Sequence, residues 1–130
     1  MRSKTERRRR QGFSLLDRFS SLRHACNGLG VMLIEQHNAR IHCGVALLVL
    51  TLGLLTGLKT LEWLIVVLAI CLVLMAEAFN SAVEYLADAA VPEQNELIRK
   101  AKDVSAAAVM ISAVFAVLVG FWAFVPWLFR

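Results

Sequence analysis

The sequence lacks the short motifs that mark the common nucleotide-binding and hydrolytic enzymes. It contains no Walker A loop, no glycine-rich kinase loop and no GxSxG nucleophile elbow. Its three cysteines, Cys26, Cys43 and Cys71, show no CxxC or metal-ligand spacing, and two of them lie in apolar stretches. We therefore expect the cysteines to act as small apolar side chains, which leaves no support for a disulfide scaffold or a zinc site.

Charged residues are scarce over most of the chain, which is 58% hydrophobic and has a mean hydropathy of +0.64. This composition is too apolar for an ordinary soluble domain of 130 residues. Ile41 to Leu58 and Val104 to Val125 have about the 20 residues that a membrane-spanning helix needs, and Leu61 to Met75 reaches that length only with the polar residues that follow. We therefore predict an all-α integral membrane protein. Its transmembrane helices are expected at about 41–58, 61–88 and 95–125.

Basic residues gather before the first predicted span and again in the segment that contains Arg99, Lys100 and Lys102. Because basic flanks stay on the cytoplasmic side, this pattern predicts a cytoplasmic N-terminus, an outer turn at 59–62 and an inner loop before the third span. Retention in the cytoplasm also accounts for the basic start without nucleic-acid binding. The charges within the next segment argue against a cleaved secretory signal.

The segment before the first span divides into two parts. Residues 1–12 are arginine-rich, lack apolar periodicity and are predicted to be disordered. From about 14 to 37, apolar side chains fall on one face of a helix. This face could lie on the membrane surface or pack against a partner helix. Its members are Leu15, Phe19, Leu22, Cys26, Leu29 and Leu33.

A polar stripe follows the apolar stretch that ends at Met75. On a helix, Glu77, Asn80, Glu84 and Asp88 lie on one face over about three turns, or ~16 Å. A charged group near the bilayer centre costs at least ~2.5 kcal/mol, so such groups pair, line a wet cavity or serve a function. Oxygen ligands of this kind suit Mg²⁺. The residues alone leave three interpretations open: hydrogen bonding between helices, a proton or cation pathway, and a metal-dependent site.

At these residues the sequence resembles the prokaryotic diacylglycerol kinase and undecaprenol kinase family of small membrane lipid kinases. The resemblance is carried by EAFNSAVEYLAD and KAKDVSAAAV, with further support from SLRHACNGL and NARIH, and order and spacing agree from about Ser21 onward. It implies a lipid kinase domain over 13–130 that transfers the γ-phosphoryl group of ATP to a lipid hydroxyl with Mg²⁺. It also implies a homotrimer in the bacterial inner membrane, with an amphipathic surface helix before three spans and sites shared between neighbouring protomers. The stretches NARIH, LEW and LAI look more like the undecaprenol branch than the diacylglycerol branch.

The resemblance also implies a role for each matching residue. Glu77 matches the family's proposed general base, and Glu84 matches its Mg²⁺ ligand. The residues that match the nucleotide site are Asn80, Lys102 and Asp103. Three more, Glu93, Gln94 and Asn95, fall where the family's loop approaches the nucleotide. Asn95 is in addition a candidate N-cap for the third span.

Two positions depart from the family pattern. The second metal-site carboxylate of the family falls on Gln36, whereas the acid here is Glu35, one residue earlier. We therefore expect Glu35 as the second metal ligand, through a shift of helix register or with weaker metal binding. His24 replaces a tyrosine near the nucleotide and could stack on ATP or hydrogen-bond to it. These departures keep open a catalytically degenerate membrane scaffold or a small cation-pathway protein.

Overall fold

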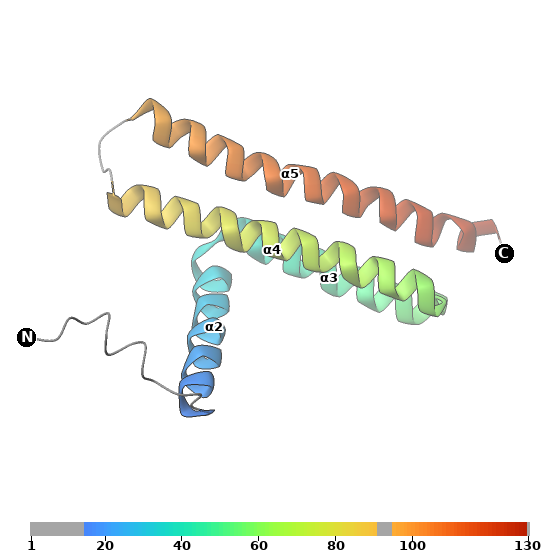
Figure 1. The fold of residues 1–130 in the computed structure, drawn as a ribbon. Coiled ribbons are helices and arrows are strands. Elements are labelled where there is room, and N and C mark those ends of the chain that lie inside the picture. Colours follow the sequence, from blue (N-terminus) through green and yellow to red (C-terminus); the bar gives the residue numbers. More distant parts are fainter. Residues whose placement is uncertain (1–14, 91–94, 130) are drawn as a thin grey trace, which may run out of the picture. The chain divides into compact units, whose positions relative to one another are not determined.

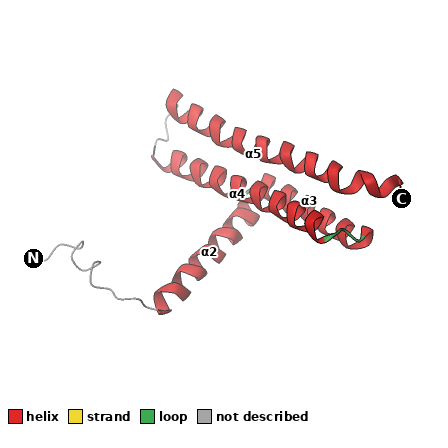
Figure 2. Ribbon diagram, turned by 45° about the vertical axis from the view of Figure 1, so that its right-hand side comes forward, coloured by secondary structure: helices red, strands yellow, loops and turns green. Residues whose placement is uncertain are grey.

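The computed structural model describes residues 15–90 and 95–129, and every element in these residues is helical. The α-helices are α2 (Leu15–Glu35), α3 (His37–Thr56), α4 (Thr60–Ala90) and α5 (Glu96–Phe124), and a 3-10 helix, η1 (Val125–Phe129), follows α5. Figure 2 shows these helices in red and the short turn between α3 and α4 in green. The all-α prediction is confirmed. The predicted disordered segment, 1–12, lies outside the described residues.

Three of these helices, α3, α4 and α5, are long and apolar enough to cross a membrane. The prediction of three such helices is confirmed, with shifted boundaries. The first begins at His37 rather than near 41, because the polar residues before the apolar stretch already belong to the helix. The second extends to Ala90, so the whole polar stripe lies on α4.

The chain divides into two compact units, and the boundary between Val31 and Met32 lies within α2. The predicted surface helix of about 14–37 is present as a helix, although it ends at Glu35. The break occurs at Gln36, whose backbone is extended (φ −94°, ψ 115°) and which occupies the N-cap position of α3. Phe19 and Leu22 on the predicted apolar face are exposed. The position of this face at a membrane surface stays a prediction.

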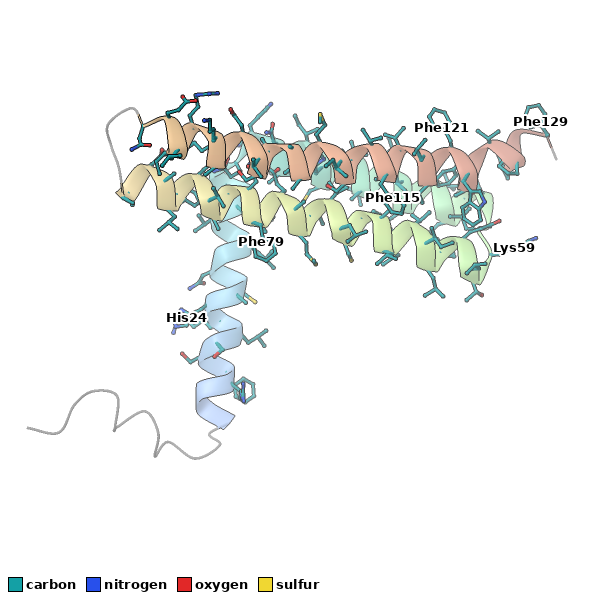
Figure 3. The ribbon with its side chains drawn as sticks, turned by 45° about the horizontal axis from the view of Figure 1, so that its top comes forward. His24, Lys59, Phe79, Phe115, Phe121 and Phe129 are labelled. Atoms are coloured by element: carbon teal, nitrogen blue, oxygen red, sulfur yellow. The ribbon has the colours of Figure 1, made fainter. Side chains whose placement is uncertain are left out.

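Within the second unit, α4 packs against both α3 and α5 (Figure 1). The core between α4 and α5 is formed by Val66, Ala69, Val119 and Ala123. Large apolar side chains cover the outer faces, and Phe79 and Phe121 project away from the helices (Figure 3). A solvent-facing surface of this kind would be unfavourable in water, whereas lipid tails accept it at no cost.

A tight turn joins α3 to α4. Gly57 ends α3 in the left-handed conformation with φ +66°, which glycine adopts without steric penalty. Its backbone N–H donates to the carbonyl oxygen of Gly53. The Glu62 carboxylate accepts a hydrogen bond from the Lys59 backbone N–H at 2.7 Å and so closes the start of α4. These local contacts turn the chain back antiparallel.

Gly53 lies against Trp63 where α3 meets α4. A Cβ on Gly53 would stand 2.8 Å from Trp63 Cη2 and 3.1 Å from Leu58 Cδ1. We expect Gly53→Ala to lower the melting temperature in detergent micelles, because overpacking costs about 1–3 kcal/mol and alanine's better helix propensity returns only ~1 kcal/mol. Gly44→Ala on the same helix is the control, since none of the described atoms lies within 4 Å of its added Cβ. Equal melting temperatures for the two variants would contradict this packing.

Candidate functional site

The polar stripe of α4 is graded in exposure along the helix. Glu77, Asn80 and Ser81 are buried, with exposed fractions of 1%, 6% and 4%. Glu84 is half-buried and Asp88 is exposed. The helical period places these side chains on one face, and the packing of α4 against its neighbours covers the part nearest the apolar stretch. The stripe therefore runs from a buried end at Glu77 to an open end at Asp88.

The buried end holds a carboxyl group that is not fully hydrogen-bonded. Glu77 Oε2 has no hydrogen-bond partner among the described residues. Ser81 Oγ donates to the backbone carbonyl of Glu77 at 2.9 Å and leaves the carboxyl oxygens untouched. His42 on α3 is near enough to interact with the Glu77 carboxyl electrostatically. Buried polar atoms are normally bonded, so this oxygen can accept a further hydrogen bond.

Asn80 connects α4 to α5. Ser105 Oγ lies 2.7 Å from Asn80 Oδ1, and Asn80 Nδ2 donates to Glu84 Oε1 at 3.3 Å. Sequence reasoning selected Asn80 and Glu84 but missed Ser105. The sequence carries little signal for Ser105, because its contact with Asn80 bridges 25 positions.

Glu35, the last residue of α2, contacts α4 through Tyr85. Tyr85 Oη donates to Glu35 Oε2 at 2.9 Å. The side chain of Gln36 also interacts with this hydroxyl, so both candidates for the second metal-site position meet at one side chain. Tyr85, which sequence reasoning missed, directly follows Glu84 in the sequence. Glu35 therefore contacts the residue that follows Glu84 on α4.

Glu84 and Glu35 have the ligand type that a magnesium site needs. Within the described ranges, no three His, Cys, Asp or Glu side chains come together as a metal-binding group. Glu84 and Glu35 accept hydrogen bonds from neutral groups, the Asn80 amide and the Tyr85 hydroxyl, and the ion pairs of the described residues involve other acids. Mg²⁺ usually takes one or two carboxylates and completes its shell with phosphate oxygens and water. Both carboxylates thus remain able to bind a cation.

Basic side chains line the start of α5. Lys102 Nζ pairs with Asp88 on α4. Arg99 pairs with Glu96 and with Asp103, each at 2.8 Å, and these partners are largely exposed. Lys102 is thus at the open end of the stripe, whereas Asp103 pairs with Arg99 on its own helix, and the nucleotide-binding roles of both stay predictions. Arg99 is a third candidate for this region that sequence reasoning did not select.

The remaining predicted site residues are Glu93, Gln94, Asn95 and His24. Glu93 and Gln94 lie outside the described residues. Asn95 is the N-cap of α5, as predicted, and its side-chain oxygen accepts from the Leu97 backbone N–H at 2.8 Å. His24 lies in the first unit, where its Nε2 is 3.5 Å from Ser20 Oγ. The nucleotide-binding roles of these residues stay predictions.

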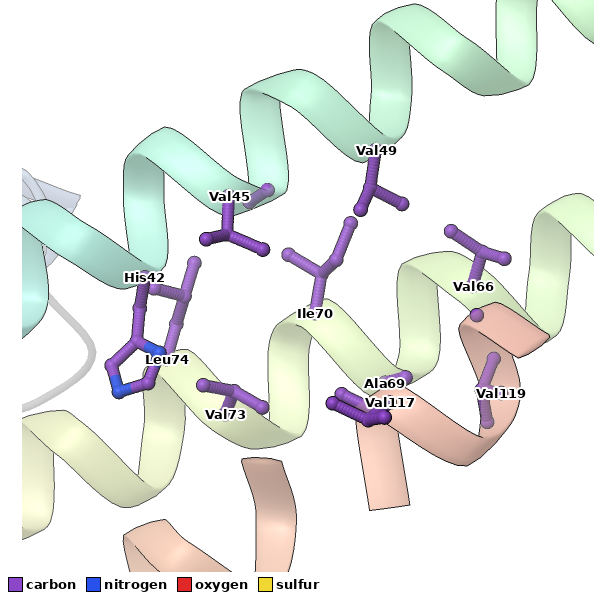
Figure 4. A pocket seen from close by; sticks show the side chains of 13 residues that line it. His42, Val45, Val49, Val66, Ala69, Ile70, Val73, Leu74, Val117 and Val119 are labelled. Carbon is purple, nitrogen blue, oxygen red and sulfur yellow. The ribbon is translucent and has the colours of Figure 1, made fainter. Parts of the chain in front are cut away.

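An apolar cavity of about 190 Å³ lies between α3, α4 and α5. Figure 4 shows Val45, Val49, Ile70 and Val73 among the residues that line it, with His42 beside Val73 and Leu74 at one end. Val73 precedes Glu77 by one helical turn on the same face of α4. One end of the cavity therefore lies about one helical turn from Glu77 on α4.

Comparisons with known proteins identify the family of this chain. The family described as prokaryotic diacylglycerol kinase matches residues 23–124. An undecaprenol kinase from Bacillus subtilis is 32% identical over 108 residues, which cover 83% of this chain and 88% of the relative. A diacylglycerol kinase from Helicobacter pylori is 31% identical over 109 residues, covering 84% of each chain.

A second diacylglycerol kinase, from Synechocystis, is 36% identical over 101 residues, which cover 77% of this chain and 58% of that relative. The family match extends from α2 to the end of α5, so it includes the polar stripe and the basic start of α5. The chain therefore belongs to the prokaryotic diacylglycerol kinase family and is a lipid kinase.

Proposed function

We propose that this lipid kinase transfers the γ-phosphoryl group of ATP to the hydroxyl group of a membrane lipid, with Mg²⁺ as cofactor, and that it favours undecaprenol over diacylglycerol. The observation that carries the proposal is the position of Glu77. Glu77 is 1% exposed, has an unpartnered carboxyl oxygen and lies on α4 between Val73, which lines the apolar cavity, and the polar residues that follow. Along α4, apolar residues are followed by polar residues. A lipid alcohol shows the same order, because its apolar chain ends in a hydroxyl group.

In the proposed reaction, Glu77 acts as the general base. Its free Oε2 accepts the proton of the lipid hydroxyl as the hydroxyl oxygen attacks the γ-phosphorus atom of ATP. The bond between that phosphorus and the bridging oxygen of ADP breaks, and ADP leaves. Burial keeps water away from the attacking oxygen, which favours transfer to the lipid over hydrolysis of ATP.

The open end of the stripe is proposed to bind the nucleotide. Glu84 and Glu35 would hold Mg²⁺, which would supply positive charge against the phosphate groups. Asn80 orients Glu84 through its amide, and Lys102 contributes a positive charge. The contact between Lys102 and Asp88 is partly exposed and contributes at most about 1 kcal/mol. Lys102 can therefore exchange Asp88 for a phosphate oxygen at little cost.

The preference for undecaprenol is supported by the stretches NARIH, LEW and LAI, which resemble the undecaprenol branch of the family. The cavity of about 190 Å³ has room for a segment of one hydrocarbon chain, which either lipid can supply. The relative from Bacillus subtilis is named undecaprenol kinase, whereas those from Helicobacter pylori and Synechocystis are named diacylglycerol kinases. Relatives of both kinds have similar identity to this chain, so the assay must decide between the substrates.

We further propose that the protein is a homotrimer in the bacterial inner membrane with a cytoplasmic N-terminus. The basic residues before α3 and around Arg99 support this orientation, because basic flanks remain in the cytoplasm. The half-buried Glu84 supports an oligomer, because a charged group that borders the bilayer favours cover by another protein surface over contact with lipid tails.

Lipid phosphorylation by the purified protein tests this function. The protein in lipid-containing detergent micelles is given labelled ATP and Mg²⁺, with undecaprenol or diacylglycerol in separate reactions. We expect a labelled lipid in both and a higher kcat/KM with undecaprenol. A known member of the family in parallel reactions is the positive control. A higher kcat/KM with diacylglycerol would overturn the substrate preference alone. No labelled lipid from either alcohol would favour a membrane scaffold or a cation pathway instead.

A further inference from the structure

We propose that Ser105 on α5 is a positioning residue that holds Glu84 in place through Asn80. The inference rests on the proposed role of Glu84 in binding Mg²⁺. Ser105 Oγ is 2.7 Å from Asn80 Oδ1, and Asn80 Nδ2 is 3.3 Å from Glu84 Oε1. The three side chains thus form one line of hydrogen bonds from α5 to the acid on α4.

The chemistry of the amide determines the direction of these bonds. An asparagine side chain has an acceptor oxygen on one side and a donor NH2 group on the other, whereas an ionised carboxylate only accepts. If the Asn80 oxygen faced Glu84, two acceptors would stand opposite each other. The NH2 group therefore faces Glu84, the oxygen faces α5, and the Ser105 hydroxyl supplies the proton between Ser105 and Asn80.

Ser105 has a competing acceptor within its own helix. Its Oγ is also 2.8 Å from the backbone carbonyl oxygen of Lys102. A hydroxyl has one proton, so it serves the two oxygens in turn or shares the proton between them. The bond within α5 is available to a serine at any helical position. Only the hydrogen bond to Asn80 affects the orientation of the Glu84 side chain.

The hydrogen bond from Ser105 is important because Asn80 is buried. Asn80 is 6% exposed, so water cannot readily replace a lost donor at its side-chain oxygen. Without the Ser105 hydroxyl, the amide can rotate toward other partners, and Glu84 then loses the donor that orients it. Hydrogen bonds in such a line strengthen one another where the surroundings have a low dielectric constant. Ser105 therefore acts on metal binding without touching the metal.

The chain offers a matched control on the same helix. Ser112 is also half-buried on α5, and its Oγ donates to the Val109 carbonyl at 2.8 Å, three residues back, as Ser105 does to Lys102. In the described part of the chain, Ser112 makes no hydrogen bond to another helix. Ser112→Ala thus removes the bond within α5 alone, whereas Ser105→Ala removes that bond and the link to Asn80.

The test measures metal binding directly. The affinity of the protein for Mn²⁺ in the presence of a non-hydrolysable ATP analogue is determined by electron paramagnetic resonance for wild type, Ser105→Ala, Ser105→Thr and Ser112→Ala. We expect Ser105→Ala to weaken Mn²⁺ binding by about 3- to 10-fold, the effect of one hydrogen bond. The Mg²⁺ concentration for half-maximal activity should rise by a similar factor, with KM for the lipid unchanged. Ser105→Thr, which keeps the hydroxyl, should restore both values, and Ser112→Ala should match wild type.

Equal Mn²⁺ affinity for wild type and Ser105→Ala would overturn the inference, as would equal losses in Ser105→Ala and Ser112→Ala. Melting temperatures measured without metal identify any loss that comes from misfolding. If Ser105→Ala does not fold, Ser105→Cys replaces it, and its weaker donor should give an intermediate loss. Failure of the wild-type protein to bind Mn²⁺ with the analogue would instead refute the proposed role of Glu84, so the two failures are distinguishable.

Discussion

The Glu77→Gln variant should lose lipid phosphorylation by about 10²- to 10⁴-fold, the usual contribution of a general base, and should still bind ATP. Glutamine has nearly the same shape as glutamate but cannot take up the proton of the lipid hydroxyl. Glu77 lies at the buried end of the stripe, one helical turn from the apolar cavity, whereas the proposed nucleotide contacts lie farther along α4. The change should therefore lower kcat and leave nucleotide affinity largely intact.

Two measurements check the Glu77→Gln prediction: transfer of labelled phosphate to the lipid, and binding of a fluorescent ATP analogue. Glu62→Gln is the matched control, because Glu62 lies at the opposite end of the same helix and glutamine can still accept the bond from Lys59. This control should keep wild-type activity. A Glu77→Gln protein with normal turnover would remove Glu77 as the base and favour a solely structural role for its carboxyl group.

The Glu84→Ala variant should raise the Mg²⁺ concentration needed for half-maximal activity by at least about 10- to 100-fold, because loss of an outer-shell partner alone commonly weakens metal binding that much. Glu84 is half-buried, receives a hydrogen bond from Asn80 and precedes Tyr85, the residue that contacts Glu35. Removal of one of two carboxylates leaves Glu35 and the nucleotide phosphates to hold the ion. High Mg²⁺ should therefore restore part of the activity.

A Mg²⁺ titration of phosphorylation, after treatment with a chelator, measures the Glu84 effect. Asp88→Ala is the control, because Asp88 is an exposed acid one turn farther along the same stripe and pairs with Lys102. Its Mg²⁺ requirement should stay within a small factor of wild type. An unchanged titration for Glu84→Ala would show that this carboxylate does not bind the metal.

Much of the fold could be predicted because it depends on local patterns. The length of each apolar stretch predicts three helices, and the helical period predicts that Glu77, Asn80 and Glu84 share one face. Asn95 was identified as an N-cap from its residue type and its place before α5. The helix boundaries were less accurate, since His37, Asn38 and Arg40 are polar but belong to the start of α3.

The partners of the site residues could not be predicted in the same way. Ser105 meets Asn80 across 25 positions of the sequence, and Tyr85 meets Glu35 across 50. Such contacts depend on the translation and rotation of one helix relative to its neighbour. Arg99 and Asp103 form an ordinary pair within one helix, so residue spacing would have been sufficient to find that pair.

By itself, the sequence determined that this chain forms three membrane-length helices and that one of them carries a line of acids beyond an apolar stretch. These features follow from hydrophobicity and helical period, which neighbouring residues specify. Only the tertiary structure decided that Glu77 is buried beside an apolar cavity, that Glu35 and Gln36 both meet Tyr85, and that Ser105 reaches Asn80. The physical reason is that burial and hydrogen bonding between helices depend on the packing of α3, α4 and α5 as a whole.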